Sequence, residues 1–163
     1  MSDLIIPTVS QGLLWALMAL GVYITFRVLD IADLSVEGTF PLGAAVASTA
    51  LTAGLGTVPA FLLAAVAGAL AGIVTALLTT KLKIPALLAG ILTMIGLYSV
   101  NLHVMGKANI SLLRVDTVFS LVRDWGVTDA VATFIVGLAA VLLVGVAIYW
   151  FFGTCLLYTS DAA

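Results

Sequence analysis

The sequence predicts an all-α fold, a polytopic bundle of about five transmembrane helices with one amphipathic helix on the membrane surface. Of the 163 residues, 63% are hydrophobic and only 9% are charged, whereas a soluble domain is nearer half apolar and one quarter charged. The apolar residues form runs close to the roughly 20 residues that cross a bilayer. Most of the few charges lie between these runs. Together these observations indicate a multi-pass membrane protein.

The first two apolar runs differ in whether they are long enough to span a bilayer. Leu4–Phe26 is long enough to span a bilayer, tolerates Pro7 in its first turns and stops at Arg27. No basic segment precedes it and no small-residue cleavage site follows, so we interpret it as a retained helix and not a signal peptide. Phe40–Leu55 is rich in small residues and reaches spanning length only if residues 35–39 also enter the membrane.

Three further spans follow in the second half of the chain. The third is closed by two lysines, the fourth opens at a proline, and the fifth ends in an aromatic cluster. Within the third, Gly68 and Gly72 form a Gly-xxx-Gly pair, which predicts a close helix contact. The spans are Ala60–Thr80, Pro85 to about Val100, and Val127 or Thr128 to Phe152.

The segment between the fourth and fifth spans, Asn101–Gly126, has another pattern. Apolar residues recur at helical spacing and polar residues fill the other positions. We predict an amphipathic helix on the membrane surface; the alternative is a solvated connector. The apolar positions are Leu112, Val115, Phe119, Val122 and Trp125.

The acidic run after the first span has two interpretations. In one, Asp30, Asp33 and Glu37 are loop charges: Asp33 or Ser35 caps the next helix, and Glu37 lies in its first turn, where the helix dipole favours an anion. In the other, the segment re-enters the membrane and lines or gates a path, and glycine and proline break the helix there. The residues of that hypothesis are Asp33, Ser35, Glu37, Gly38, Pro41 and Gly43.

Other kinds of chemistry find no support in the sequence. There is no phosphate-binding Gly-x-x-x-x-Gly-Lys-Ser/Thr loop, and no basic patch large enough for nucleic acid. His103 and Cys155 are the only histidine and the only cysteine, so neither has a like partner for a metal site or a disulfide. We therefore expect no catalytic residue, no metal site and no cofactor.

Several stretches of the sequence carry a family resemblance. Asp33–Gly43 is the most specific of them, supported by Gly21–Asp30, Leu88–Met94 and Asn101–Ile110. From about Gly12 to Thr154 the chain resembles the permease subunit of bacterial ABC importers of the branched-chain amino-acid/ribose permease superfamily. It is most similar to the branch labelled tryptophan/tyrosine-type or uncharacterised.

The resemblance implies a subunit that hydrolyses nothing itself. Such permeases pair as dimers in the lipid of the bacterial inner membrane, dock on two ABC ATPase subunits and receive a small solute, such as an amino acid, from an extracytoplasmic substrate-binding protein. Two other functions stay open from the residues: a secondary carrier that uses the acidic residues directly, and a structural membrane subunit of a larger complex.

The resemblance also bears on the chain's ends. Residues 1–154 are expected to be a partial permease transmembrane domain. In the family a helix that docks on the ATPase would follow just after Thr154, so the resemblance implies that this helix and the later spans are missing from the chain. Residues 155–163 resemble translated adapter read-through, so we expect a non-native tail; the alternative is a genuine short tail. The six basic residues divide three and three between the two sides, and those of the first group lie nearer span ends, which favours an outside N-terminus.

Overall fold

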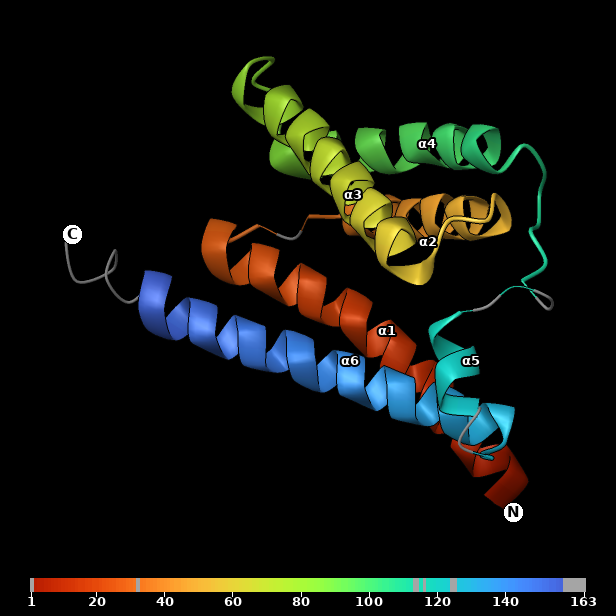
Figure 1. Cartoon of the computed structure of the whole chain (residues 1–163). Coiled ribbons are helices and arrows are strands. Elements are labelled where there is room, and N and C mark those ends of the chain that lie inside the picture. Colours follow the sequence, from red (N-terminus) through yellow and green to blue (C-terminus); the bar gives the residue numbers. More distant parts are fainter. Residues whose placement is uncertain (1, 32, 113–114, 116, 124–125, 157–163) are drawn as a thin grey trace.

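The computed structural model describes residues 2–31, 33–112, 115, 117–123 and 126–156. Every regular element in this part of the chain is helical (Figure 1), which confirms the predicted all-α class. In chain order the elements are α1 (Ser2–Leu29), α2 (Val36–Thr52), α3 (Thr57–Thr80), α4 (Ala86–Met105), α5 (Val118–Arg123), α6 (Asp129–Phe151) and a π-helical turn, η1 (Phe152–Leu156).

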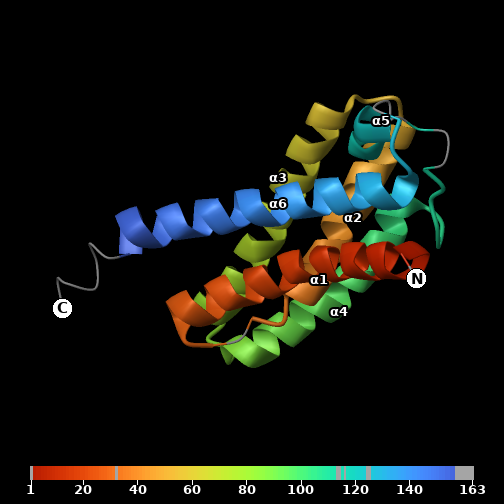
Figure 2. The ribbon, with the colours of Figure 1, turned by 90° about the horizontal axis from the view of Figure 1, so that it is seen from below.

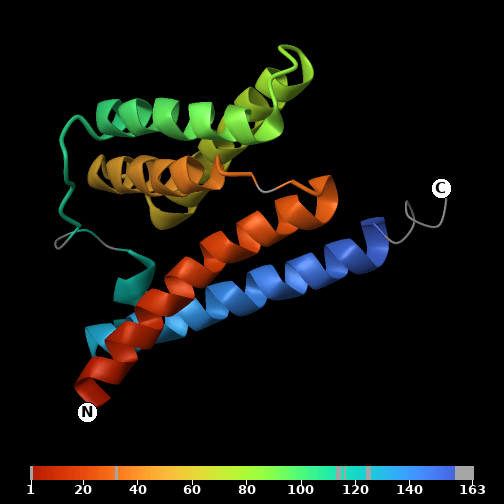
Figure 3. The ribbon, with the colours of Figure 1, turned by 180° about the vertical axis from the view of Figure 1, so that it is seen from behind.

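The long helices form two groups. Helices α1 and α6 lie side by side and run in the same direction, while α2 packs against both α3 and α4 (Figures 1 and 3). Helices α1, α3 and α6 run away from the end that holds the N-terminus, and α2 and α4 return to it. Seen from below, the α1–α6 pair covers one side of the α2–α3–α4 group (Figure 2). Successive long helices therefore alternate in direction, as in a multi-pass membrane protein.

The interior of this bundle is made of small side chains. Leu42, Ala71 and Leu97 form its buried cluster, and most other buried hydrophobic residues are alanines. Large apolar side chains are on the outside instead; Leu143 and Trp150 are each 70% exposed. Small residues inside and large apolar residues outside are expected when the surrounding solvent is lipid, because close packing then drives helix association. The multi-pass membrane assignment is confirmed.

Four helical segments are long and apolar enough to cross a membrane among the residues that the structure describes: Leu4–Val28, Thr57–Thr80, Ala86–Met105 and Asp129–Thr154. The other expected span is α2, which has 17 residues. A helix of that length rises about 26 Å, slightly less than the roughly 30 Å hydrocarbon core. A fifth crossing by α2 therefore stays a prediction.

The expected amphipathic helix is much shorter than its periodicity indicated. Among the described residues between the end of α4 at Met105 and Gly126, only α5 is helical, and Leu112 and Val115 lie outside it; Trp125 falls outside the described residues. The local cause is a capping arrangement, in which the Thr117 N–H donates to Ser120 Oγ at 3.2 Å. Ser120 Oγ also donates to the Thr117 carbonyl at 2.8 Å, so its hydroxyl holds the backbone of Thr117 directly before the first residue of α5. The extended surface helix was a wrong prediction for the described residues before Thr117.

The Gly-xxx-Gly pair of α3 does not make the predicted close contact. A Cβ on Gly68 would lie 3.7 Å from Thr39 Cγ2 of α2, an ordinary contact distance, and a Cβ on Gly72 would meet no atom within 4 Å. The alanines of α3 already set its distance from α2: Ala71 is buried in the central cluster and Ala67 packs against it. Gly72 instead faces away from the helices packed against α3.

A buried hydrogen bond joins α3 to α4, and it yields a prediction. The Thr75 hydroxyl donates to Thr93 Oγ1 at 3.0 Å, and both residues are buried. Thr93→Val keeps the shape but removes the acceptor, so we expect a loss of about 0.6 kcal/mol, and at most about 2 kcal/mol, in unfolding free energy. Unfolding in a detergent titration measures it. Thr80→Val, which loses only a bond to its own helix, should change less; equal losses would contradict the prediction.

Candidate functional site

The α1–α2 connection is held by the Asp33 carboxylate. Helix α1 ends where Asp30 takes a left-handed backbone conformation, with φ 56°. Asp33 Oδ1 then accepts the Ser35 N–H at 2.8 Å, the local bonding that aspartate favours before a helix. Ser35 occupies the N-cap of α2 as predicted and is buried, but its side chain makes no capping bond. The capping interpretation is thus confirmed in position and corrected in mechanism.

Helix α4 packs closely against this connection through Gly90. A Cβ at Gly90 would lie 3.0 Å from Asp33 Oδ1, 3.1 Å from the Leu34 nitrogen and 3.2 Å from the Ser35 nitrogen. These separations are shorter than normal carbon contacts, so only glycine lets the two segments meet without a shift. Asp33 and Ser35 therefore anchor α2 to α4.

Helices α2 and α4 also lie unusually close together one turn further along α2, at Gly38. A Cβ at Gly38 would lie 2.9 Å from Met94 Cα and 3.2 Å from Leu97 Cβ. The backbones of α2 and α4 touch here, as small residues allow.

The predicted helix break is absent. Gly38, Pro41 and Gly43 all lie inside α2, and a Cβ at Gly43 would meet no atom within 4 Å. Pro41 comes early in the helix, where its missing N–H leaves only the Glu37 carbonyl without its usual donor. The cost is small enough for the helix to continue, so the prediction of a break was wrong.

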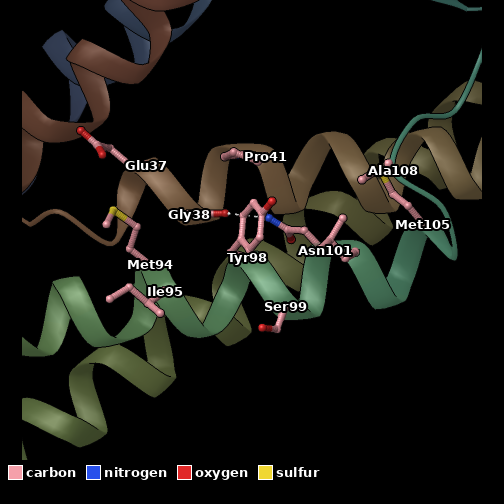
Figure 4. Close-up of a pocket in the computed structure, with 11 residues that line it drawn as sticks. Glu37, Gly38, Pro41, Met94, Ile95, Tyr98, Ser99, Asn101, Met105 and Ala108 are labelled. Carbon is pink, nitrogen blue, oxygen red and sulfur yellow. Dashed lines mark hydrogen bonds between the residues drawn. The ribbon is translucent and has the colours of Figure 1, made fainter.

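A groove of about 730 Å³ runs between α2 and α4 (Figure 4). Helix α2 contributes Glu37, Gly38 and Pro41, and helix α4 contributes Tyr98 and Asn101 among others. Three of the six residues of the path hypothesis therefore meet in one groove. The other three lie outside the groove. Asp33 and Ser35 pack against Gly90 of α4, and Gly43 is on a part of α2 where a Cβ would meet no atom within 4 Å.

Asn101 is the most unusual residue of this groove. Its side chain is 7% exposed, and Nδ2 donates to the Gly38 carbonyl at 3.4 Å (Figure 4). Within the part of the chain that the structure describes, its Oδ1 has no hydrogen-bond partner. The fourth span was expected to end at about Val100, with Asn101 in the connector that follows. Helix α4 instead continues to Met105 and ends at Gly106, which has a left-handed φ of 64°.

The groove offers no metal centre. Within the described parts of the chain, no three His, Cys, Asp or Glu residues lie close enough together to hold a metal ion. Glu37 is exposed at one end of the groove and Asn101 is buried further along it. Among the described residues that line it, the groove has no Lys, His or Cys to pair as nucleophile or base.

Comparison with known proteins supports a transport role. A family model described as the permease component of branched-chain amino acid transport systems matches residues 4–154. A tyrosine transport system permease protein of Clostridioides difficile (strain R20291) is 46% identical over 116 residues, which cover 71% of this chain and 39% of that protein. An uncharacterized protein of Rickettsia prowazekii (strain Madrid E) is 36% identical over 146 residues, 88% of this chain and 51% of that protein.

These relatives are much longer than the matched region. The chain spans about two fifths of the length of the first and about half of the second. No solved structure matches the chain significantly.

Proposed function

Because the chain belongs to the family of permease components of branched-chain amino acid transport systems, we propose that it forms part of the translocation path of an ATP-driven importer. The proposed solute is a small molecule. An amino acid is proposed because the chain is similar to a permease protein of a tyrosine transport system. The subunit hydrolyses nothing itself. The groove between α2 and α4 carries the proposal, because it gathers the polar residues Glu37 and Asn101 beside helices that are otherwise apolar.

The proposed assembly contains four kinds of component. A second permease copy completes the path, an ABC ATPase drives it, an extracytoplasmic binding protein delivers the solute, and the lipid of the bacterial inner membrane surrounds it. The exposed apolar side chains of α3 and α6 support contact with lipid. The end of the bundle with Arg27, Lys81 and Lys83 is proposed to be cytoplasmic, since basic residues close to span ends favour that side.

Two domain assignments also stay proposals. Residues 1–154 are a partial transmembrane domain, and residues 155–163 are a non-native tail; of these, 157–163 lie outside the described residues. The lengths of the relatives support a longer natural protein. A longer read of the gene tests this directly: continuation of permease sequence after Thr154 is the expected result, and a stop codon after Ala163 would contradict it.

The function is tested by reconstitution. Proteoliposomes that contain the full permease, its ATPase and its binding protein should take up labelled tyrosine or leucine only when ATP is present. Uptake without the ATPase, driven by a proton gradient, would favour a secondary carrier. Absence of uptake with every component present would favour a purely structural subunit.

The Glu37 carboxylate provides a prediction within this assay. Glu37 is exposed and lines the groove, so Glu37→Gln should lower ATP-driven uptake several-fold while membrane abundance stays unchanged. An exposed side chain contributes little to folding, which separates the two readouts. Thr52→Val, at the other end of α2, is the control and should leave uptake unchanged. Normal uptake by Glu37→Gln would remove Glu37 from the path.

A further inference from the structure

We propose that the groove between α2 and α4 contains a subsite for the protonated primary amine of the transported solute, with Asn101 Oδ1 as its buried acceptor. The inference rests on the proposed function, because it assumes that the solute passes through this groove. It adds the chemical class of the ligand and the residues that select it.

The orientation of the Asn101 amide is set by its neighbour. Its Nδ2 faces the Gly38 carbonyl oxygen at 3.4 Å, and the opposite orientation would place two acceptors against each other. Oδ1 is therefore the other end of the amide, buried and without a hydrogen-bond donor among the described residues. A buried acceptor without a partner costs about 1–3 kcal/mol. A ligand that donates a hydrogen bond would recover this free energy.

The remaining polar groups around Asn101 also favour a cationic donor. Pro41 has no N–H, so the Glu37 carbonyl lacks its i+4 backbone donor. Glu37 lines one end of the groove, and its carboxylate points away from α4 and from Asn101, so it supplies a negative charge at a distance and not a direct contact (Figure 4). Among the described residues that line the groove there is no Lys, Arg or His to bind an anion. Acceptors and a negative charge without a cation suit an ammonium group.

The rest of the groove suits an apolar body attached to that amine. Met94, Tyr98 and Met105 line it on the α4 side. Its volume of about 730 Å³ lies within the usual range of small-molecule sites. Methionine and aromatic side chains pack well against aromatic rings. The ligand class is therefore an amino acid with an aromatic or large apolar side chain, held by its amine.

The two groove methionines make the proposal measurable. We suggest labelling the methionine methyl groups with ¹³C in the full permease in nanodiscs and titrating three probes: tyrosine, tyramine, which lacks the carboxylate, and 3-(4-hydroxyphenyl)propionate, which lacks the amine. Tyrosine and tyramine should shift the methyl signals of Met94 and Met105. The propionate should not shift them, and Met18 of α1, outside the groove residues, is the internal reference.

Substitutions in the groove test whether Asn101 Oδ1 accepts the hydrogen bond from the amine. Asn101→Ala should weaken tyramine binding about tenfold or more, since a hydrogen bond to a charged group contributes about 1.5–3 kcal/mol. His103→Ala is the control on the same helix, because His103 is exposed and is not one of the residues that line the groove. An unchanged Met18 signal shows that a variant is folded. Where Asn101→Ala does not fold, Glu37→Gln takes its place, with a several-fold weaker affinity for tyramine expected.

Three results would overturn the subsite: equal binding of the propionate, unchanged tyramine binding by both Asn101→Ala and Glu37→Gln, or no shift of Met94 and Met105 with any probe. ATP-driven uptake in the reconstituted importer is measured separately. Normal uptake together with any of these results removes the amine subsite and leaves the proposed function standing. Loss of uptake in the wild type removes the proposed function itself.

Discussion

Gly38→Ala is expected to lower the unfolding free energy of the permease by about 1–2 kcal/mol and to reduce uptake. The added Cβ would lie 2.9 Å from Met94 Cα, a backbone atom that cannot rotate away. Overpacking of this kind costs about 1–3 kcal/mol, of which the better helix propensity of alanine offsets up to about 1 kcal/mol. The two helices must separate, which also moves the Gly38 carbonyl away from Asn101.

Gly43→Ala is the matched control for this change. Both glycines lie in α2, but a Cβ at Gly43 would meet no atom within 4 Å. Only the propensity gain remains there, so the variant should be as stable as the wild type or slightly more stable. Detergent-induced unfolding followed by circular dichroism measures both variants. Equal stability of the two would show that α2 and α4 do not touch at Gly38.

Gly90→Val should have an effect of similar size, about 1–3 kcal/mol, at the other end of the same contact. Its Cβ would press on the Asp33 carboxylate oxygen at 3.0 Å and on two backbone nitrogens at 3.1 and 3.2 Å. The connection before α2 would have to move as a unit. Gly96→Val is the control on the same helix, because a Cβ there would meet no atom within 4 Å.

A double-mutant cycle tests whether Gly38 and Gly90 report one interface. Once α4 has moved away from α2 in Gly90→Val, the Gly38→Ala clash should cost less. The combined loss is therefore expected to be smaller than the sum of the single losses, since residues that share a contact are not additive. Additive losses would mean that the two ends of the contact between α2 and α4 adjust independently.

The spans were largely predictable because hydropathy and length are local properties of the sequence. The run from Leu4 to Phe26 became α1, and the positions of Lys81 and Pro85 bracketed the turn before α4. Asp33–Gly43 was also identified correctly as the informative segment. The motif indicated the family, and three of its residues proved to line the groove.

The helix contacts were not predictable in the same way. Gly68 and Gly72 have the spacing of a packing motif, yet the close approach occurs at Gly38 and Gly90. Spacing shows that two glycines share a face, but only the assembled bundle decides which face meets a neighbour. Asn101 was missed for a related reason: its polarity resembled the end of a span, although burial against Gly38 keeps it within the helix.

The pairing of α1 with α6 has a consequence for how the chain is made. The Ser10 hydroxyl lies 3.4 Å from the Ala130 carbonyl, a contact across 120 residues. At about 5–20 residues per second of synthesis, α1 waits several seconds in the bilayer before α6 exists. During that time Ser10 can bond within its own helix, since its hydroxyl also reaches the Ile6 carbonyl at 2.7 Å. During synthesis α1 is therefore the first of these helices to enter the membrane, and α6, the helix it packs against, is the last.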